Sequence, residues 1–381
     1  VFPEGSKIDL TPSHLSICIS SLQDVKLFNS NLQVIDEAFE YLVSKSQKGE
    51  KGQYFTPRHV IDMCVKMLNP KRGEYMIDSA AGSCGFPVHT IFQMTGHLFT
   101  NQEISEEEKD DVLKVFGIDF DEKVVRVARC LNLIAGDGET NVLHLNTLDY
   151  ERWNQRTSNE DWLDTYGAGW NRLKRKRSNG ESNKEFGFDI LMANPPFAGD
   201  IKESRIISKF ELGKKANGKW QSKVGRDILF IERNLDFLKP GGRMAIVLPQ
   251  GRFNNTTDKH IRNFISEKAR ILAVVGLHVN TFKPHTGTKT SVLFVQKWDD
   301  ELCPKVDDYP IFFGVSEKAG KNNSGDYVFV KNGNGNLKLD QFGHFIVNHD
   351  LHNHEGELNS EIAEIFKEFA LDNNLSFWVN E

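Results

Sequence analysis

A short motif in the middle of the chain, Asn194-Pro195-Pro196-Phe197, combines residue types suited to binding a planar amine. It directly follows the apolar run 188–193, which is typical of a buried strand. Two consecutive prolines fix φ and remove two backbone donors, so the carbonyl groups here have no strand to pair with. Those carbonyls and the Asn194 amide oxygen offer acceptors to the two hydrogens of an amino group, and Phe197 offers a face for a flat ring. The motif predicts a site for an exocyclic amine; the alternative is a proline-stiffened turn with an Asn cap.

A second candidate site is the loop from Asp78 to Phe86, which lies between an apolar run and the start of a predicted helix. Small residues let a ligand approach the backbone, and an acid at a strand end can hold a cationic or hydroxylated group. The residues that we assign to ligand binding are Asp78, Ala80, Ala81, Gly82, Ser83 and Gly85. The chain lacks the phosphate-binding patterns G-x-G-x-x-G and G-x-x-x-x-G-K-[ST], which favours a compact adenosyl ligand over a nucleoside triphosphate.

Two further acidic residues follow predicted strands. Asp119 ends the run 115–119, a position at which a carboxylate accepts hydrogen bonds from ribose hydroxyls, and Phe120 beside it could cover an adenine face. Asp149, which follows the run 142–145, is a weaker candidate for adenine binding. The alternative for Asp119 is a solvent-exposed acid at the end of a strand.

The first candidate along the chain is Tyr54-Phe55-Thr56-Pro57. Thr56 suits the N-cap of a helix and Pro57 suits its first position, and the apolar pattern that follows is helical. Two interpretations stay open. The segment only starts a helix, or the free amides at that helix N-terminus, together with the Thr56 hydroxyl, hold the carboxylate of a ligand.

Short apolar runs that alternate with helical patterns must position these residues. Strands are predicted at 75–78, 115–119, 142–145, 188–193, 243–248, 271–276 and 291–296. Helices are predicted at 57–68, 85–94, 122–134, 227–238 and 258–268. The alternation predicts an α/β fold with a mostly parallel sheet, helices on both faces, and ligands at the carboxyl ends of the strands.

Three segments are predicted along the chain. Residues 1–50 are expected to form a helical N-terminal segment, because apolar residues recur at three- or four-residue steps between Ser30 and Lys45. Residues 51–298 form the α/β domain. Residues 299–381 carry Gly- and Asn-rich turns and a final amphipathic helix at 361–369, which indicates an appended C-terminal extension suited to partner contacts. We find no internal repeat.

Within the α/β domain, residues 150–186 form a polar, irregular stretch. Trp153, Trp162 and Trp170 are scattered around the basic run 172–177. The stretch predicts a solvated insertion; the alternative is contact with a DNA backbone, because clustered Lys and Arg side chains release counterions from phosphates.

The composition excludes several classes of protein. With 39% hydrophobic and 26% charged residues, the chain of 381 residues is neither disordered nor collagen-like. No apolar run reaches the ~18 residues of a membrane-spanning helix. Five cysteines without a C-x-x-C pair favour neither a zinc site nor a disulfide framework, and no leader pattern is seen, so we expect a cytoplasmic protein without a metal. A net charge of −6 excludes a uniformly basic surface, although a local patch could bind nucleic acid.

Taken in order, these motifs and the run 238–249 resemble the amino-methyltransferase family. More closely, the chain resembles the modification (M) subunit of type I restriction-modification systems, an adenine-N6 DNA methyltransferase. The likeness covers about residues 30–298. In the family the Gly-bearing loop more often has Pro, Cys and Gly where this chain has Ser79, Ala81 and Cys84. A Cys in place of Gly is harmless at negative φ, but at positive φ it strains the backbone or crowds the ligand.

The resemblance implies a Rossmann-like methyltransferase sheet with S-adenosylmethionine as cofactor. It assigns the carboxylate end of the cofactor to Thr56 with Tyr54 and Phe55, the methionyl region to the loop from Asp78 to Gly85, the ribose to Asp119, and the adenine to Phe120 and Asp149. Asn194, Pro195, Pro196 and Phe197 would take the target base. The loop 276–290 resembles the family's base-pocket loop, in which Phe282 would stack on the other face of a flipped adenine; the alternative is a long hairpin turn.

The function implied is methyl transfer from S-adenosylmethionine to the N6 amino group of a flipped adenine in DNA. The partners implied are double-stranded DNA, a specificity (S) subunit, a second modification subunit and a restriction (R) subunit, with no membrane. Two alternatives remain. A site for a planar amine also suits RNA or a protein glutamine amide, and the altered glycine loop allows a catalytically silent scaffold in a DNA-binding complex.

Overall fold

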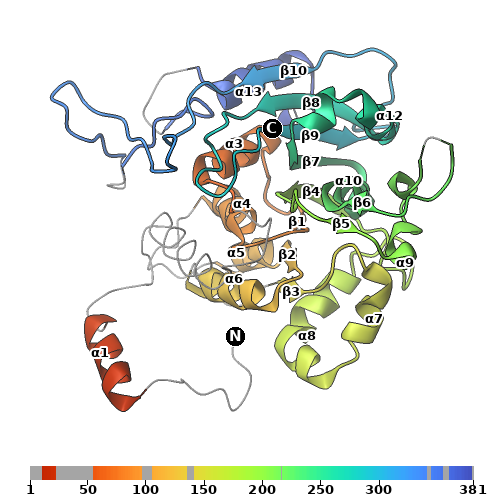
Figure 1. Ribbon diagram of the computed structural model, residues 1–381, viewed down its shortest axis with the longest axis horizontal. Helices are drawn as coiled ribbons and strands as arrows, with labels where there is room; N and C mark the ends of the chain where they lie inside the picture. Colours follow the sequence, from red (N-terminus) through yellow and green to blue (C-terminus); the bar gives the residue numbers. More distant parts are fainter. Residues whose placement is uncertain are drawn as a thin grey trace.

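A mixed eight-stranded sheet forms the centre of the computed structural model (Figure 1). The structure describes residues 11–22, 55–96, 105–134, 141–215, 217–340, 345–354 and 360–379. The strand order is β10-β8-β9-β7-β4-β1-β2-β3. The strands are β1 (Met76–Asp78), β2 (Val115–Asp119), β3 (Val142–His144), β4 (Phe188–Ala193), β7 (Leu238–Pro249), β8 (Ala269–Gly276), β9 (Thr290–Lys297) and β10 (Phe312–Val315). Within this sheet β9 runs antiparallel to β7 and β8, whereas the other neighbours pair in parallel.

Helices cover both faces of the sheet. The longer helices are α1 (Pro12–Leu22), α3 (Arg58–Leu68), α4 (Gly85–Thr95), α5 (Glu106–Val112), α6 (Glu122–Ile134), α8 (Glu160–Lys174), α10 (Arg226–Phe237), α12 (Lys259–Lys268) and α13 (Ile362–Asp372). Shorter elements are α7 (Trp153–Arg156), α9 (Ser204–Ile207), α11 (Gly251–Asn254), α14 (Ser376–Val379) and the strand pair β5 (Asp200–Ile201) and β6 (Val224–Gly225).

Two buried apolar clusters lie on opposite faces, because residues alternate along β4 between them. Leu191 joins the cluster that includes residues of α6, α8, α10 and α12, and its neighbour Met192 joins the cluster that includes residues of α3, α4 and α13. The predicted α/β sheet with helices on both faces is therefore confirmed, and every predicted strand and helix between residues 57 and 298 is present. Within the part of the chain that the structure describes, no helix is long and apolar enough to cross a membrane.

The segment 150–186 is not a solvated insertion. It forms α7 and α8, and its three tryptophans, Trp153, Trp162 and Trp170, are 1%, 4% and 3% exposed. The indole nitrogen of Trp153 donates to Asn146 O (2.7 Å), and that of Trp162 donates to His144 O (3.1 Å). The prediction failed because charged residues on the outer face of α8 mask an apolar stripe that packs against β3.

The C-terminal residues are built into the same core rather than appended to it. β10 pairs in parallel with β8, and α13 packs against α3 with Phe366 fully buried. The predicted final helix is present as α13. At the other end, α1 lies inside the predicted helical segment, whereas the helical pattern between Ser30 and Lys45, the predicted boundary near residue 50 and Tyr54 lie outside the described residues.

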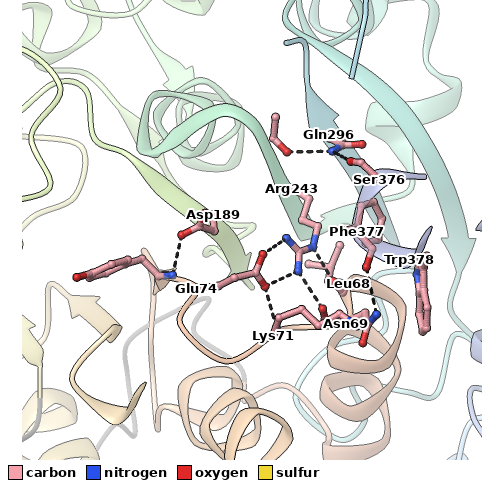
Figure 2. A network of polar contacts seen from close by, with 12 residues as sticks. Leu68, Asn69, Lys71, Glu74, Asp189, Arg243, Gln296, Ser376, Phe377 and Trp378 are labelled. Atoms are coloured by element: carbon pink, nitrogen blue, oxygen red, sulfur yellow. Dashed lines mark hydrogen bonds and ion pairs between the residues drawn. The ribbon is translucent and has the colours of Figure 1, made fainter. Parts of the chain in front are cut away.

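A buried arginine joins the amino ends of the strands (Figure 2). Arg243 of β7 is 3% exposed, and its guanidinium donates to Leu68 O (2.6 Å), Asn69 O (2.9 Å) and both carboxylate oxygens of Glu74 (2.7 Å each). Asn69 in turn donates from Nδ2 to Phe377 O (3.2 Å) of α14. The network links β7, the end of α3, the turn before β1 and the C-terminal helix.

A histidine cluster attaches the segment 345–354 to α3. His59 of α3 stacks on His349, with ring centroids 5.1 Å apart, and His349 lies 4.5 Å from His352. Burial lowers the pKa of His59 to about 3 and the pKa of His352 to about 4, so both rings are neutral at pH 7. Among the described residues, no group of three or more His, Cys, Asp or Glu side chains is arranged to hold a metal ion.

We predict that acidification destabilises the fold through this cluster. In the unfolded chain a histidine binds a proton below about pH 6.5, whereas buried His352 does not until about pH 4, so stability is lost as the pH falls through this window. His352→Gln should therefore lose about 1 kcal/mol less stability than the wild type between pH 7 and pH 5.5. The free energy of unfolding from urea titrations at both pH values is the measurement, with His14→Gln, an exposed histidine of α1, as control. Equal losses in wild type and His352→Gln would contradict the prediction.

Candidate active site

Parallel pairing brings three predicted site segments to one edge of the sheet. β1 lies between β2 and β4, with Met76 in register with Val115 and with Ile190. Asp78, Asp119 and the motif that begins at Asn194 therefore lie at the carboxyl ends of three adjacent strands. The chain order also reverses at β1, where open α/β sheets bind their ligands.

The Asp78 loop is held by buried hydrogen bonds. Asp78 is 1% exposed, its Oδ1 accepts from Ala80 N (3.0 Å), and burial raises the pKa of this carboxyl well above its ordinary value. Ser79 Oγ donates to Asn234 Oδ1 (2.6 Å), and Ala81 N donates to Ile118 O (2.9 Å). The loop thus presents a fixed backbone to any ligand in the crevice.

Asp119 connects this loop to the end of β2. Its Oδ2 accepts from Gly82 N (3.0 Å) and its Oδ1 from Asp121 N (2.9 Å). Asp119 is 3% exposed, which rules out the alternative of a solvent-exposed acid, and burial raises the pKa of its carboxyl. The neighbouring Phe120 is 65% exposed, so its ring offers an apolar face.

The loop glycines have different roles. Gly82 has a φ of +51°, and a Cβ built on it would lie 3.8 Å from the Phe55 ring, so two predicted cofactor residues meet here. Gly85 instead allows helix packing, because a Cβ there would lie 2.5 Å from Ile61 Cδ1 of α3. Cys84 adopts the left-handed conformation with a φ of 67°, the condition under which a side chain strains the backbone.

Thr56 is not the N-cap of α3, contrary to the sequence prediction. The N-cap is Pro57, with a φ of −58° and a ψ of 142°, and α3 begins at Arg58. Pro57 O accepts from Val60 N (2.9 Å) and Ile61 N (3.1 Å). No side-chain hydrogen bond caps this end of α3. Thr56 lies half-buried one residue before the cap.

The motif Asn194-Pro195-Pro196-Phe197 lies beside the loop that was predicted to line a base pocket. Asn194 and Phe197 are half-buried and Pro195 is buried. The rings of Phe197 and Phe282 meet edge to face, with centroids 6.2 Å apart and an interplanar angle of 85°. Phe282 is only 2% exposed, so in this conformation it supports the Phe197 ring and does not offer a free stacking face. Direct stacking of Phe282 on a base would need this ring to be exposed, and it stays a prediction.

A cavity of about 690 Å³ beside β2 and β3 brings Phe120 and Asp149 together. Asp149 already has a cationic partner, because Arg205 of α9 forms an ion pair with its Oδ1 at 2.5 Å. Sequence reasoning missed Asn146, which also lines the cavity and accepts from Leu148 N (3.1 Å). Its position two residues after β3 was the available signal.

A sequence profile described as N-6 DNA Methylase matches residues 30–365. The chain belongs to the N-6 DNA methylase family. Among curated relatives of this N-6 DNA methylase, the methylase subunit of the type I restriction enzyme EcoEI from Escherichia coli is 25% identical over 287 residues, 74% of this chain and 48% of that subunit. The chain spans about half the length of the curated relatives it matches.

Solved structures share the fold of this N-6 DNA methylase. A protein from Listeria monocytogenes, described as a class I S-adenosylmethionine-dependent methyltransferase, matches with a TM-score of 0.56 and 18% identity over 80% of each chain. A type I modification subunit from Vibrio vulnificus matches with a TM-score of 0.50 and 18% identity over 92% of this chain and 67% of that one. At these identities the likeness shows the fold, and the predicted Rossmann-like methyltransferase fold is confirmed.

Proposed function

We propose that this chain transfers a methyl group from S-adenosylmethionine to the N6 amino group of a flipped adenine in DNA, as the modification subunit of a type I restriction-modification complex. The observation that carries the proposal is the placement of Asn194-Pro195-Pro196-Phe197 at the carboxyl end of β4, beside Asp78 and Asp119 at the ends of β1 and β2. Family membership and the names of the curated relatives support the same chemistry.

The residues at the strand ends fit the cofactor. Asp119 is fixed by two backbone amides where a ribose can donate to it, and exposed Phe120 borders a cavity with Asp149, which suits adenine. Asp78 and the backbone from Ala80 to Gly85 take the methionyl region, with Thr56 and its neighbours Tyr54 and Phe55 at the carboxylate end. When bound, S-adenosylmethionine supplies an electrophilic methyl group.

The motif after β4 positions the amine. The nitrogen lone pair of N6 is conjugated with the adenine ring, so the amine is a poor nucleophile in its planar form. The Asn194 amide oxygen and the Pro195 carbonyl accept its hydrogens and hold them out of plane, while Pro196 stiffens the loop and Phe197 stacks on the ring. Orientation of this kind can supply ~7–11 kcal/mol of a barrier. The N6 lone pair would form the new N–C bond as the S–C bond of the sulfonium breaks, with the thioether as leaving group, and the methylated nitrogen would then lose one proton to water. No covalent nucleophile is needed.

Asp119→Ala should weaken S-adenosylmethionine binding at least tenfold. Hydrogen bonds to a charged acceptor contribute about 1.5–3 kcal/mol, and the substitution also frees the Gly82 amide. Isothermal calorimetry measures the dissociation constant, with Asp121→Ala, an acid two residues away that caps α6, as the matched control. Unchanged affinity in Asp119→Ala would refute the ribose assignment.

Asn194→Ala and Phe197→Ala should each reduce methyl transfer at least a hundredfold and leave cofactor affinity within about twofold, because both side chains act on the substrate amine. Tritium transfer from labelled S-adenosylmethionine to duplex DNA, RNA and protein, measured in parallel, gives the activity and the acceptor. The exposed Phe313→Ala is the control. If either variant loses cofactor binding, the residue is structural. If the label appears in RNA or protein and not in DNA, that molecule is the methyl acceptor. If the wild type shows no turnover with the partner subunits present, the chain is a scaffold.

The proposed complex supplies sequence recognition from outside this chain. A reader of base edges needs a helix, ribbon or domain in a groove. The described residues after Trp298 form β10, Asn- and Gly-rich turns, the acidic helix α13 and the short helix α14. A separate specificity subunit, a second modification subunit and a restriction subunit would complete the assembly on double-stranded DNA.

The purified chain alone should therefore select no sequence. We expect repeated binding to a random duplex pool at fixed salt to return the pool unenriched, because only phosphate contacts act. Replacing the cluster Lys174, Arg175 and Lys176 of the 150–186 segment by Gln tests the alternative in which that segment binds DNA. An enriched sequence that this triple variant loses would refute the prediction.

A further inference from the structure

Two hairpin turns of the same construction lie between β10 and α13 and are drawn as blue loops at the left of Figure 1. They follow the pattern Lys-Asn-x-x-Gly at 321–325 and at 331–335. In the first, Asn322 Oδ1 accepts from Ser324 N (2.9 Å) and Asp326 N (3.0 Å). In the second, Asn332 Oδ1 accepts from Asn334 N and Asn336 N (3.0 Å each). Gly325 and Gly335 close the turns with φ of +97° and +84°.

The first turn touches the loop 277–289, which joins β8 to β9 and carries Phe282, whereas no hydrogen bond described in the structure joins the second turn to this loop. A Cβ built on Gly325 would lie 2.5 Å from Pro284 N, whereas one built on Gly335 would meet nothing within 4 Å. Asn280 Nδ2 donates to Asn323 Oδ1 (2.9 Å). Lys321, which is 7% exposed, donates from Nζ to Lys283 O (3.1 Å).

These contacts surround Phe282 on both sides in the sequence. Asn280 precedes it, and Lys283 and Pro284 follow it, so the turn holds the backbone that sets the position of the Phe282 ring. That ring packs edge to face on Phe197 of the amine-binding motif. A displacement of the loop at Pro284 is therefore transmitted through one ring contact to the ring proposed to stack on the base.

We propose that the turn 321–327 is a positioning element of the base site, which holds loop 277–289 so that Phe282 fixes Phe197 in its stacking orientation. This inference rests on the proposed function for Asn194 to Phe197. The proposal gives the residues of this turn no direct contact with the base or the cofactor. They act through Phe282, by restricting a long loop that would otherwise sample many conformations.

The test compares Gly325→Ala with Gly335→Ala. Both place a side chain at a positive φ and share that strain, but only Gly325→Ala presses on Pro284. With labelled S-adenosylmethionine and unmethylated genomic DNA, in the presence of the partner subunits, we expect Gly325→Ala to lower kcat at least tenfold and Gly335→Ala less than twofold. The KM for S-adenosylmethionine should stay within twofold in both. Hydrogen exchange of residues 277–289 should accelerate only in Gly325→Ala.

A second pair of variants, which perturb the fold less, keeps the test valid if Gly325→Ala misfolds. Asn323→Ala removes the acceptor for Asn280 without touching the backbone, and Asn323→Asp keeps an oxygen there, so the first should lose activity and the second should retain it. Equal kcat and equal exchange in the two glycine variants, or equal activity in the two Asn323 variants, would overturn the positioning role. Absence of methyl transfer in the wild-type complex would instead overturn the proposed function and this role with it, while exchange still reports whether the turn holds the loop.

Discussion

The buried Arg243 guanidinium is the interaction on which the alignment of the strands depends (Figure 2). A buried cation costs several kcal/mol unless it is paired and hydrogen-bonded. Its acceptors, Leu68 O, Asn69 O and Glu74, come from the end of α3 and the turn before β1. Only one placement of β7 relative to these segments satisfies all of them. Since β7 pairs with β4 and β4 pairs with β1, this constraint at the amino ends also fixes which residues meet at the carboxyl ends.

At the carboxyl ends of the strands, by contrast, acidic groups are buried at a cost in free energy. Asp78 and Asp119 are buried, and burial raises the pKa of both, so their charged forms are held at a cost in free energy. Their carboxylates accept hydrogen bonds from backbone amides, and among the described residues no cationic side chain donates to them. A ligand that donates hydrogen bonds recovers part of this cost. The stability of the amino ends thus allows an unfavourable arrangement at the edge where we propose that the cofactor binds.

Local sequence signals predicted the sheet well, because the strands are mainly apolar runs and the site residues follow them directly. They failed where the decisive contact lies far along the chain. Charged neighbours in the sequence masked the apolar stripe of Trp162, Tyr166 and Trp170. The ion-pair partner of Asp149 is Arg205, which lies 56 residues further along the chain. The burial of Phe282 also depends on distant elements. The similarity of the turns at 321–325 and 331–335 is visible in the sequence, but each copy is only five residues long and therefore gives a weak signal.

The substitution of Cys84 for the family's glycine shows how the loop tolerates a costly residue. A side chain in the left-handed region costs roughly 1–2 kcal/mol. Cys84 is fully buried, and a Cβ built on Gly117 of β2 would lie 3.3 Å from its sulfur and 3.0 Å from Ala81 Cβ. The glycine at 117 therefore leaves the space that the thiol occupies beneath the loop. The strain falls on the backbone and the thiol packs toward β2, so the Asp78 and Asp119 carboxylates keep their hydrogen bonds to Ala80 and Gly82. We therefore infer that Cys84 lowers the stability of the loop and leaves the proposed cofactor site intact.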